Sequence, residues 1–465
     1  MTDVWGCAII SSGMIMDKQK AEQAIQRILE QARRLEESTL KKQCDTSILS
    51  DHIAEGSQGK GFFGTDLEKA FFHIEPNNFD RPDFFPIPLE LKSAPLKYSD
   101  TRNRLIPKER IVLGVINYCD IVNESFESSH FKYKNETILI VWYIYDKLIR
   151  SIDMKVDLVD LWQCIKEDGK QIEEDWNTIV DKVKEGKAEE ISEGDTLYLG
   201  ACTKGATAES SLRQQPNSTI KAKQRAFCFK ISYVNHIYET MKARKKHRAE
   251  QRRFLSGNMA TASIEQSVLI LFRPYIGMTS CQIESALGIH SDGKARFAFY
   301  ARTILGYSQK NKSFYEFDAA NIQIKAIRVE PNGKPKEDMS FKNIKFKEIV
   351  TQDWEDSDLY QELISKFIFV IFRKTEDGLD YYLDKVKFWN MPESDLDIVQ
   401  KVWERTKIQS IRRDFNHLPR KAENPIIHVR TKGKNSSDLT ETADGSWITK
   451  RCFFLNNNYI ASKLC

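Results

Sequence analysis

Residues 83–92 read DFFPIPLELK, and this stretch decides the fold and the chemistry that we expect. Its last two leucines alternate with Glu90 and Lys92. A period of two predicts a β-strand, with the leucines turned into a core and Glu90 and Lys92 together on the opposite face. Asp83 lies seven residues before Glu90, ahead of two prolines, so we expect it in a neighbouring turn.

Two carboxylates beside one ammonium group suit the hydrolysis of a phosphodiester. Carboxylate oxygens bind Mg²⁺, and the ion neutralises the charge that develops on the phosphate. The pattern therefore indicates Asp83 and Glu90 as metal ligands, with Lys92 orienting the attacking water or stabilising the transition state. The alternative is a solvated Glu/Lys pair on an amphipathic strand.

The composition is that of an ordinary globular protein. The 465 residues are 41% hydrophobic and 29% charged, which favours two or three domains. A net charge of only +4 means that any DNA-binding surface must come from local clustering. Nine cysteines without a CxxC pair indicate reduced thiols. The most apolar run, residues 137–145, is too short to span a bilayer. We therefore expect a cytoplasmic protein with no membrane partner.

Two charged groups near this stretch extend the candidate site. Glu68 lies in a predicted helix start at 65–72 and is a candidate third carboxylate, or a partly solvated cap. Lys134, with two other basic residues, precedes the buried strand predicted at 137–145. Basic residues at this point favour contact with phosphate, although a solvated strand end is the alternative.

A second set of basic residues lies further along the chain. Residues 196–207 predict a strand running into a turn at Lys204, and residues 220–233 mix basic with apolar side chains. The pattern predicts DNA contacts or a charged surface strand; its basic members are Lys221, Lys223, Arg225 and Lys230. Residues 242–253 hold seven Lys or Arg and predict a basic linker or helix.

The second half of the chain repeats the first without most of its acids. At an offset of 233 residues, Lys325 aligns with Lys92 and Gln323 with Glu90. The same offset places Glu316 on Asp83 and Ala301 on Glu68. Further matches pair Lys432 with Lys204, next to Arg430. Since Gln and Ala supply no charge, we expect one copy to hold a metal and the other only to bind DNA.

These motifs together resemble a known family. GFFGTDLEKAFF, DFFPIPLELK, SSHFKYK, EEDW, ISEGDTLYLGACTKGA and IKAKQRAF stand in the order found in the MutH-like endonucleases, and above all in their two-domain type II restriction enzymes that cut GATC. The resemblance spans nearly the whole chain. It departs from MutH at the recognition turn, where ACTKGA replaces an Arg-Pro-Lys run.

The resemblance implies an α/β fold with two tandem restriction-endonuclease-like domains, each a mixed five-stranded sheet flanked by helices. Residues 1–241 would be the catalytic domain, 242–254 a basic linker, and 255–465 a degenerate domain that binds a second GATC copy as an effector. Asp83 and Glu90 would hold Mg²⁺ and Lys92 would complete the motif, with Glu68 as an additional acid and Lys134 as a supporting lysine. The implied DNA-binding residues are Lys204, Lys221, Lys223, Arg225, Lys230, Arg430 and Lys432.

The function implied is a Mg²⁺-dependent type II restriction endonuclease that cuts double-stranded DNA 5′ to G in GATC and leaves 5′-phosphates. Two chains would pair on DNA as a homodimer, or one would nick the strands in succession, and a cognate methyltransferase would act on the same site. Two alternatives remain: a strand-nicking mismatch-repair endonuclease, and a DNA-binding protein without catalysis.

Overall fold

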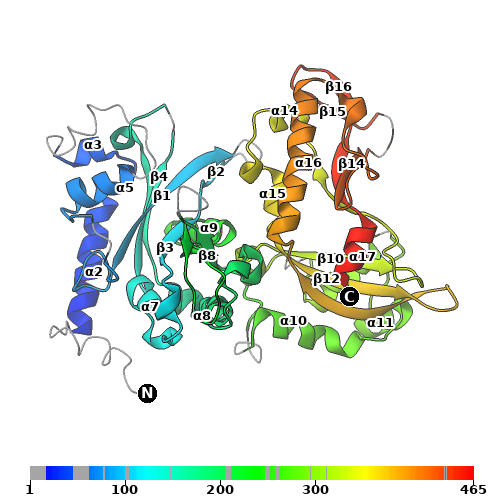
Figure 1. Cartoon of the computed structure of the whole chain (residues 1–465), viewed down its shortest axis with the longest axis horizontal. Helices are drawn as coiled ribbons and strands as arrows, with labels where there is room; N and C mark the ends of the chain where they lie inside the picture. The colour runs from blue at the N-terminus through cyan, green and yellow to red at the C-terminus, as the bar shows by residue number, and fades with distance from the viewer. Residues whose placement is uncertain are drawn as a thin grey trace. The chain divides into compact units, whose positions relative to one another are not determined.

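The computed structural model describes residues 17–45, 62–76, 79–99, 104–146, 148–204, 211–246, 252–256, 262–293, 295–309, 312–433, 435 and 437–464. The chain divides into two compact units, residues 1–250 and 251–465 (Figure 1). The predicted loop at 56–61 and the turn after Lys204 lie outside the described residues. In the described part, no helix is long and apolar enough to cross a membrane.

The first unit is built on a mixed four-stranded sheet with the order β2-β1-β4-β5, in which β1 and β4 are parallel and the other pairs antiparallel. A three-stranded antiparallel sheet, β3-β9-β6, stands apart from it. The strands are β1 (Glu90–Ser99), β2 (Arg104–Pro107), β3 (Ile111–Val115), β4 (Ile138–Ile144), β5 (Val156–Trp162), β6 (Leu199–Thr203), β7 (Leu212–Arg213), β8 (Ala222–Lys223) and β9 (Arg225–Phe229).

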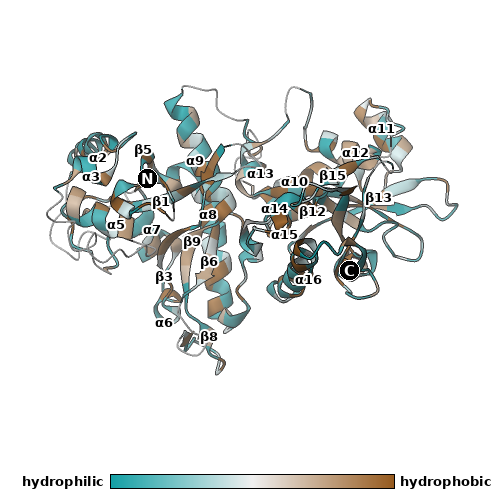
Figure 2. Ribbon diagram, turned by 90° about the horizontal axis from the view of Figure 1, so that it is seen from above, coloured by the Kyte–Doolittle hydropathy of each residue, from teal (hydrophilic) through white to brown (hydrophobic). Residues whose placement is uncertain are grey.

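Helices cover both faces of the four-stranded sheet. On one face the amphipathic α2 packs against Leu89, Leu91 and the alternating residues of β4, with its polar side outward (Figures 1 and 2). On the other face the buried Trp142 indole meets Met241 and Tyr238 of α9. The helices are α2 (Lys18–Arg33), α3 (Leu40–Gln43), α5 (Phe62–Asp66), the π-helix η1 (Leu67–Phe71), α6 (Tyr118–Ile121), α7 (His130–Asn135), α8 (Cys164–Lys184) and α9 (Ile231–Lys245).

The second unit repeats this plan. Its sheets have the orders β10-β12-β13 and β11-β17-β14, again with one parallel pair, β10 with β12. The strands are β10 (Ile322–Val329), β11 (Met339–Asn343), β12 (Lys366–Lys374), β13 (Tyr381–Trp389), β14 (Ile427–Thr431), β15 (Leu439–Glu441), β16 (Trp447–Thr449) and β17 (Arg451–Leu455). The helices are α10 (Ile264–Phe272), α11 (Ser280–Leu287), α12 (Arg296–Ile304), α13 (Tyr315–Ala319), α14 (Phe346–Ile349), α15 (Asp358–Leu363), α16 (Glu393–Ile411) and α17 (Asn457–Leu464).

The strand registers show that the repeat is structural. Lys92 pairs with Ile140 across β1 and β4, and Lys325 pairs with Phe369 across β10 and β12. The offsets are 233 and 229 residues. Leu199 faces Phe229 just as Ile427 faces Leu455, and both smaller sheets carry a bulge at the same point, between Val112 and Gly114 and between Ser340 and Asn343. The two units therefore share one fold.

The α/β class and the repeat are confirmed, but the strand count differs from five. After β1 the first unit turns back as β2, which adds an antiparallel edge, while β6 and β9 pair with β3 instead of joining the main sheet. Residues 130–135 form the helix α7 rather than the start of the strand. The basic run also begins inside α9, which ends only at Lys245.

Candidate active site

Glu90 and Lys92 lie on one face of β1, as the alternation predicts. The Lys92 ammonium donates to Glu90 Oε1 at 2.6 Å. The strand starts at Glu90 because the preceding prolines supply no backbone donor, and its ladder with β4 then fixes the register. Glu90 is 1% exposed, so its charge is balanced almost entirely by protein groups.

Asp83 reaches the same place from the turn before β1. Its Oδ2 accepts the Leu91 N–H at 2.9 Å, while its own N–H donates to Glu90 Oε2 at 3.2 Å. These two bonds close the seven-residue spacing into a loop that brings both carboxylates together. The expected turn position of Asp83 is what the structure has.

Lys134 approaches from α7. Its ammonium lies 3.8 Å from Glu90 Oε1 and donates to the Phe79 carbonyl at 2.8 Å. The helix begins where the Ser129 hydroxyl accepts the Lys132 N–H, which places Lys134 one turn further on and facing β1.

The acids of this cluster hold their protons more tightly than free carboxylates. Burial raises the pKa of Glu90, the Lys92 and Lys134 ammonium groups oppose that shift, and Asp83 adds to it. Burial likewise raises the pKa of Glu68, which lies on η1; Asp83 raises it further and Lys92 lowers it. Glu68, Asp83, Glu90, Lys92 and Lys134 thus form one electrostatic unit of three acids and two cations, which we call the acidic cluster.

The acidic cluster has the chemistry of a site for a hard cation, although in the described ranges no three His, Cys, Asp or Glu side chains form a complete metal-binding group. Asp83 and Glu90 supply carboxylate oxygens, and the Lys92 ammonium on Glu90 already occupies the position of a positive charge. The excess of one negative charge, within a buried setting, favours a divalent cation over none. The residues present therefore fit such an ion.

The predicted DNA-binding residues fall into two groups. Lys221 and Lys223 are exposed, Lys204 is half-buried at the end of β6, and Arg430 and Lys432 occupy the matching region of the second unit. Arg430 lies over the Phe454 ring at 4.0 Å and pairs with Asp338 at 3.3 Å. The Lys432 ammonium donates to the Phe341 carbonyl at 2.6 Å.

Arg225 and Lys230 differ from the expectation, because both are buried. The Arg225 guanidinium donates to the Ala201 carbonyl at 2.9 Å, and the Lys230 ammonium donates to the Thr196 carbonyl at 2.8 Å and to that of Glu193. The reason is that β9 is the central strand of its sheet, so both of its faces are covered. These two cations stabilise the interior in this structure instead of lying on a DNA-binding surface.

Sequence reasoning missed the second-unit counterpart of Lys134. Ser357 caps α15 as Ser129 caps α7, with the same pair of hydrogen bonds, and this correspondence puts Glu362 at the position of Lys134. The signal was present: the strands that follow already align at an offset of 229, and carrying that alignment back one helix at 228 would have shown the reversal of charge.

The comparisons agree with this geometry. The family model for the DNA mismatch repair enzyme MutH matches residues 72–175 and 305–401, one segment in each unit. The type II restriction enzyme Sau3AI of Staphylococcus aureus is 31% identical over 470 residues, which cover 88% of this chain and 93% of that enzyme.

The chain belongs to the MutH family.

Other members of the MutH family match only part of this chain. The DNA mismatch repair protein MutH of Vibrio campbellii is 25% identical over 182 residues, 38% of this chain and 77% of that protein. MutH of Escherichia coli O139:H28 is 26% identical over 151 residues, 32% and 63% of the two chains. The α/β units described above are therefore restriction-endonuclease-like, and the two-unit length is shared with Sau3AI.

Proposed function

We propose that the chain is a Mg²⁺-dependent type II restriction endonuclease that hydrolyses double-stranded DNA 5′ to G in GATC. The observation that carries the proposal is the convergence of Asp83, Glu90 and Lys92 in a chain that aligns over 88% of its length with a type II restriction enzyme. The resemblance of the recognition segments supports GATC as the site.

In this mechanism Asp83 and Glu90 would hold the Mg²⁺ ion, with Glu68 next to them. When bound, the ion supplies positive charge beside the scissile phosphate. With the Glu90 charge then shared, the Lys92 ammonium becomes free to hold the attacking water and to donate to a phosphate oxygen. Water adds to phosphorus in line and the P–O3′ bond breaks, leaving a 3′-hydroxyl and a 5′-phosphate. Lys134 would hold Glu90 in position from α7.

The second unit is proposed to bind another GATC copy as an effector. Gln323 and Ala301 supply no ligand for a metal there, which supports a binding role. One catalytic unit cuts one strand at a time, so we propose that two chains pair on the palindrome or that single nicks follow each other. A methyltransferase acting on the same sequence would protect the DNA of the host cell, and both would work in the cytoplasm.

Digestion of unmethylated plasmid with Mg²⁺, followed by sequencing of the ends, tests the proposal. We expect linear fragments with four-base GATC overhangs and 5′-phosphates. Absence of cutting with every divalent ion tried contradicts it.

A strand-nicking repair endonuclease is the second candidate, because the mismatch-repair MutH proteins match the first unit. In that case the same digestion stops at the nicked circle, and cutting would depend on repair partners.

A further inference from the structure

The place in the second unit that corresponds to the acidic cluster has the opposite charge. Lys325 keeps the position of Lys92, but Gln323, Ala301 and Glu362 stand where the first unit has Glu90, Glu68 and Lys134. Glu316, which has the spacing of Asp83, is 3% exposed and accepts the N–H groups of Phe254 and Leu255, so it serves the fold of its own unit. One acid, Glu362, remains beside Lys325.

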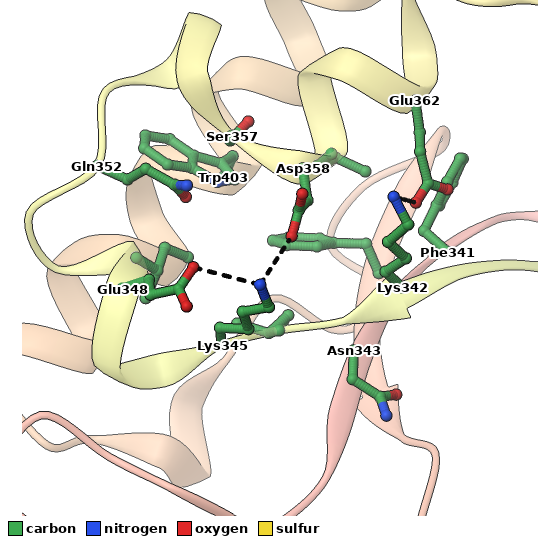
Figure 3. Close-up of a pocket in the computed structure, with 14 residues that line it drawn as sticks. Phe341, Lys342, Asn343, Lys345, Glu348, Gln352, Ser357, Asp358, Glu362 and Trp403 are labelled. Carbon is green, nitrogen blue, oxygen red and sulfur yellow. Dashed lines mark ion pairs between the residues drawn. The ribbon is translucent and has the colours of Figure 1, made fainter. Parts of the chain in front are cut away.

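Three ammonium groups gather around Phe341 of β11. Lys325 Nζ lies 5.9 Å from the centre of the Phe341 ring, and Lys432 Nζ donates to the Phe341 carbonyl at 2.6 Å. Lys342, the next residue in the bulge, lies 3.3 Å from Glu362 Oε1. Figure 3 shows Lys342 and Glu362 at one side of a pocket, while Lys345 is held separately by Glu348 and Asp358. We call Lys325, Lys342 and Lys432 the lysine cluster.

The bulge explains how the cluster gained a cation. Its counterpart in the first unit is Gly114, where an added side chain would meet nothing within 4 Å. The second unit fills that space with the side chain of Lys342. Bulges re-aim side chains next to functional sites, and here the same bulge in both units carries glycine in one and lysine in the other.

Lys325 has no hydrogen bond or ion pair within the described residues, although it is half-buried in the strand β10. Burial lowers the pKa of its ammonium group; Glu362 opposes this shift, and Lys432, Lys342 and Arg302 add to it. One carboxylate among these four cations leaves the site positive. A cation is therefore repelled here, and an oxyanion with several acceptor oxygens is attracted.

We propose that the second unit binds a backbone phosphate of duplex DNA at the lysine cluster, without a divalent metal. The phosphate lies where the scissile phosphate lies in the catalytic unit, and the lysines replace the ion. This rests on the proposed DNA-binding role of the second unit. Lys325 and Lys342 contact the phosphate oxygens, and Lys432 positions the backbone from the end of β14.

The experiment uses the full-length chain with Glu90→Gln, and a labelled duplex with one GATC site, in EDTA. Native mass spectrometry gives the number of duplexes bound, and anisotropy at several salt concentrations gives the affinity and its salt dependence. We expect two duplexes per chain. Lys325→Met should weaken the second binding step at least about tenfold and lower its salt slope by about 0.9. Lys342→Ala should act in the same direction.

Lys325→Arg keeps the charge and should restore the binding, which separates a phosphate contact from a folding defect. Lys334→Met is the matched control, since Lys334 is exposed on the loop after β10 and its loss removes the same charge. A competition arm adds inorganic phosphate at constant ionic strength: phosphate should displace the second duplex from the parent chain, and should not affect Lys325→Met at the same concentrations.

Unchanged second-site binding by Lys325→Met and Lys342→Ala overturns the inference, and so does a second duplex that binds only with Mg²⁺ or binding of free phosphate without DNA. Plasmid cleavage by the unmodified chain is scored separately. Cleavage with unaltered Lys325→Met binding removes this inference alone, whereas metal-independent binding that requires Lys325, without any cleavage, removes the catalytic proposal alone.

Discussion

The acidic cluster and the lysine cluster occupy the same place in two copies of one fold, yet they carry opposite charge. In the first unit three acids face two ammonium groups; in the second, one acid faces three lysines and an arginine. The strand registers are equal, so the difference comes from side chains alone. A sheet that presents a phosphate site can therefore serve a metal or replace it, depending on four or five positions.

The largest effect is expected from Glu90→Gln, which gives the first unit the residue of the second. Cleavage should fall by about 10³-fold or more, because a ligand carboxylate is lost while DNA contacts remain. Plasmid digestion and duplex binding measure the two properties. Gln323→Glu is the reciprocal control and should not restore cutting to Glu90→Gln, since Glu362 and Ala301 still differ. Normal cleavage by Glu90→Gln would remove the metal assignment.

Lys134→Glu copies the second reversal and should have a smaller effect. The Lys134 ammonium opposes the burial that raises the pKa of Glu90, so a carboxylate in its place raises that pKa further. Glu90 then ionises only at higher pH, and the acidic limb of the pH–rate profile should move upward. We expect a loss on the order of tenfold to a hundredfold near neutral pH, consistent with a positioning role. Lys134→Met should shift the profile less. A profile that stays in place contradicts the contact.

The two kinds of basic residue around β9 should separate in the next comparison. Lys230→Ala removes hydrogen bonds to buried carbonyls and should cost about 1–3 kcal/mol of stability, seen as a lower unfolding midpoint in urea. Lys223→Ala, at an exposed position, should leave the midpoint unchanged and weaken DNA binding uniformly. Equal stability of the two variants would show that burial of Lys230 is not what holds it.

The smallest effect concerns the pH dependence of stability without metal. Because the pKa of Glu90 is raised in the fold, the folded chain binds more protons than the unfolded chain, and stability falls as pH rises from the unfolded value of about 4.5 through the folded one. Glu90→Gln mimics the protonated acid. In EDTA at pH 7.5 it should melt a few degrees above the parent chain, and the difference should shrink toward pH 4. A lower melting temperature at pH 7.5 would be the contrary result.

Much of this could be predicted from local periodicity. The alternation around Glu90 gave the strand and its polar face, and the offset of 233 residues gave the second unit. The split of the strands into separate sheets and the burial of Arg225 and Lys230 could not be predicted in this way. Both depend on which strand becomes central, and that is decided by long-range pairing with β3 and β6. The role of Lys342 depends on a bulge that leaves no periodic trace.

The bonds that Glu316 makes have a consequence for the history of such a duplication. This carboxylate ties down the N–H groups of Phe254 and Leu255, where the second unit begins, and the Phe254 ring packs against Phe314 and Phe317. To recover catalysis, the copy would have to release the acid and loosen its own first segment. Each route back passes through a poorly folded ancestor, so the loss of chemistry in this half is a one-way step.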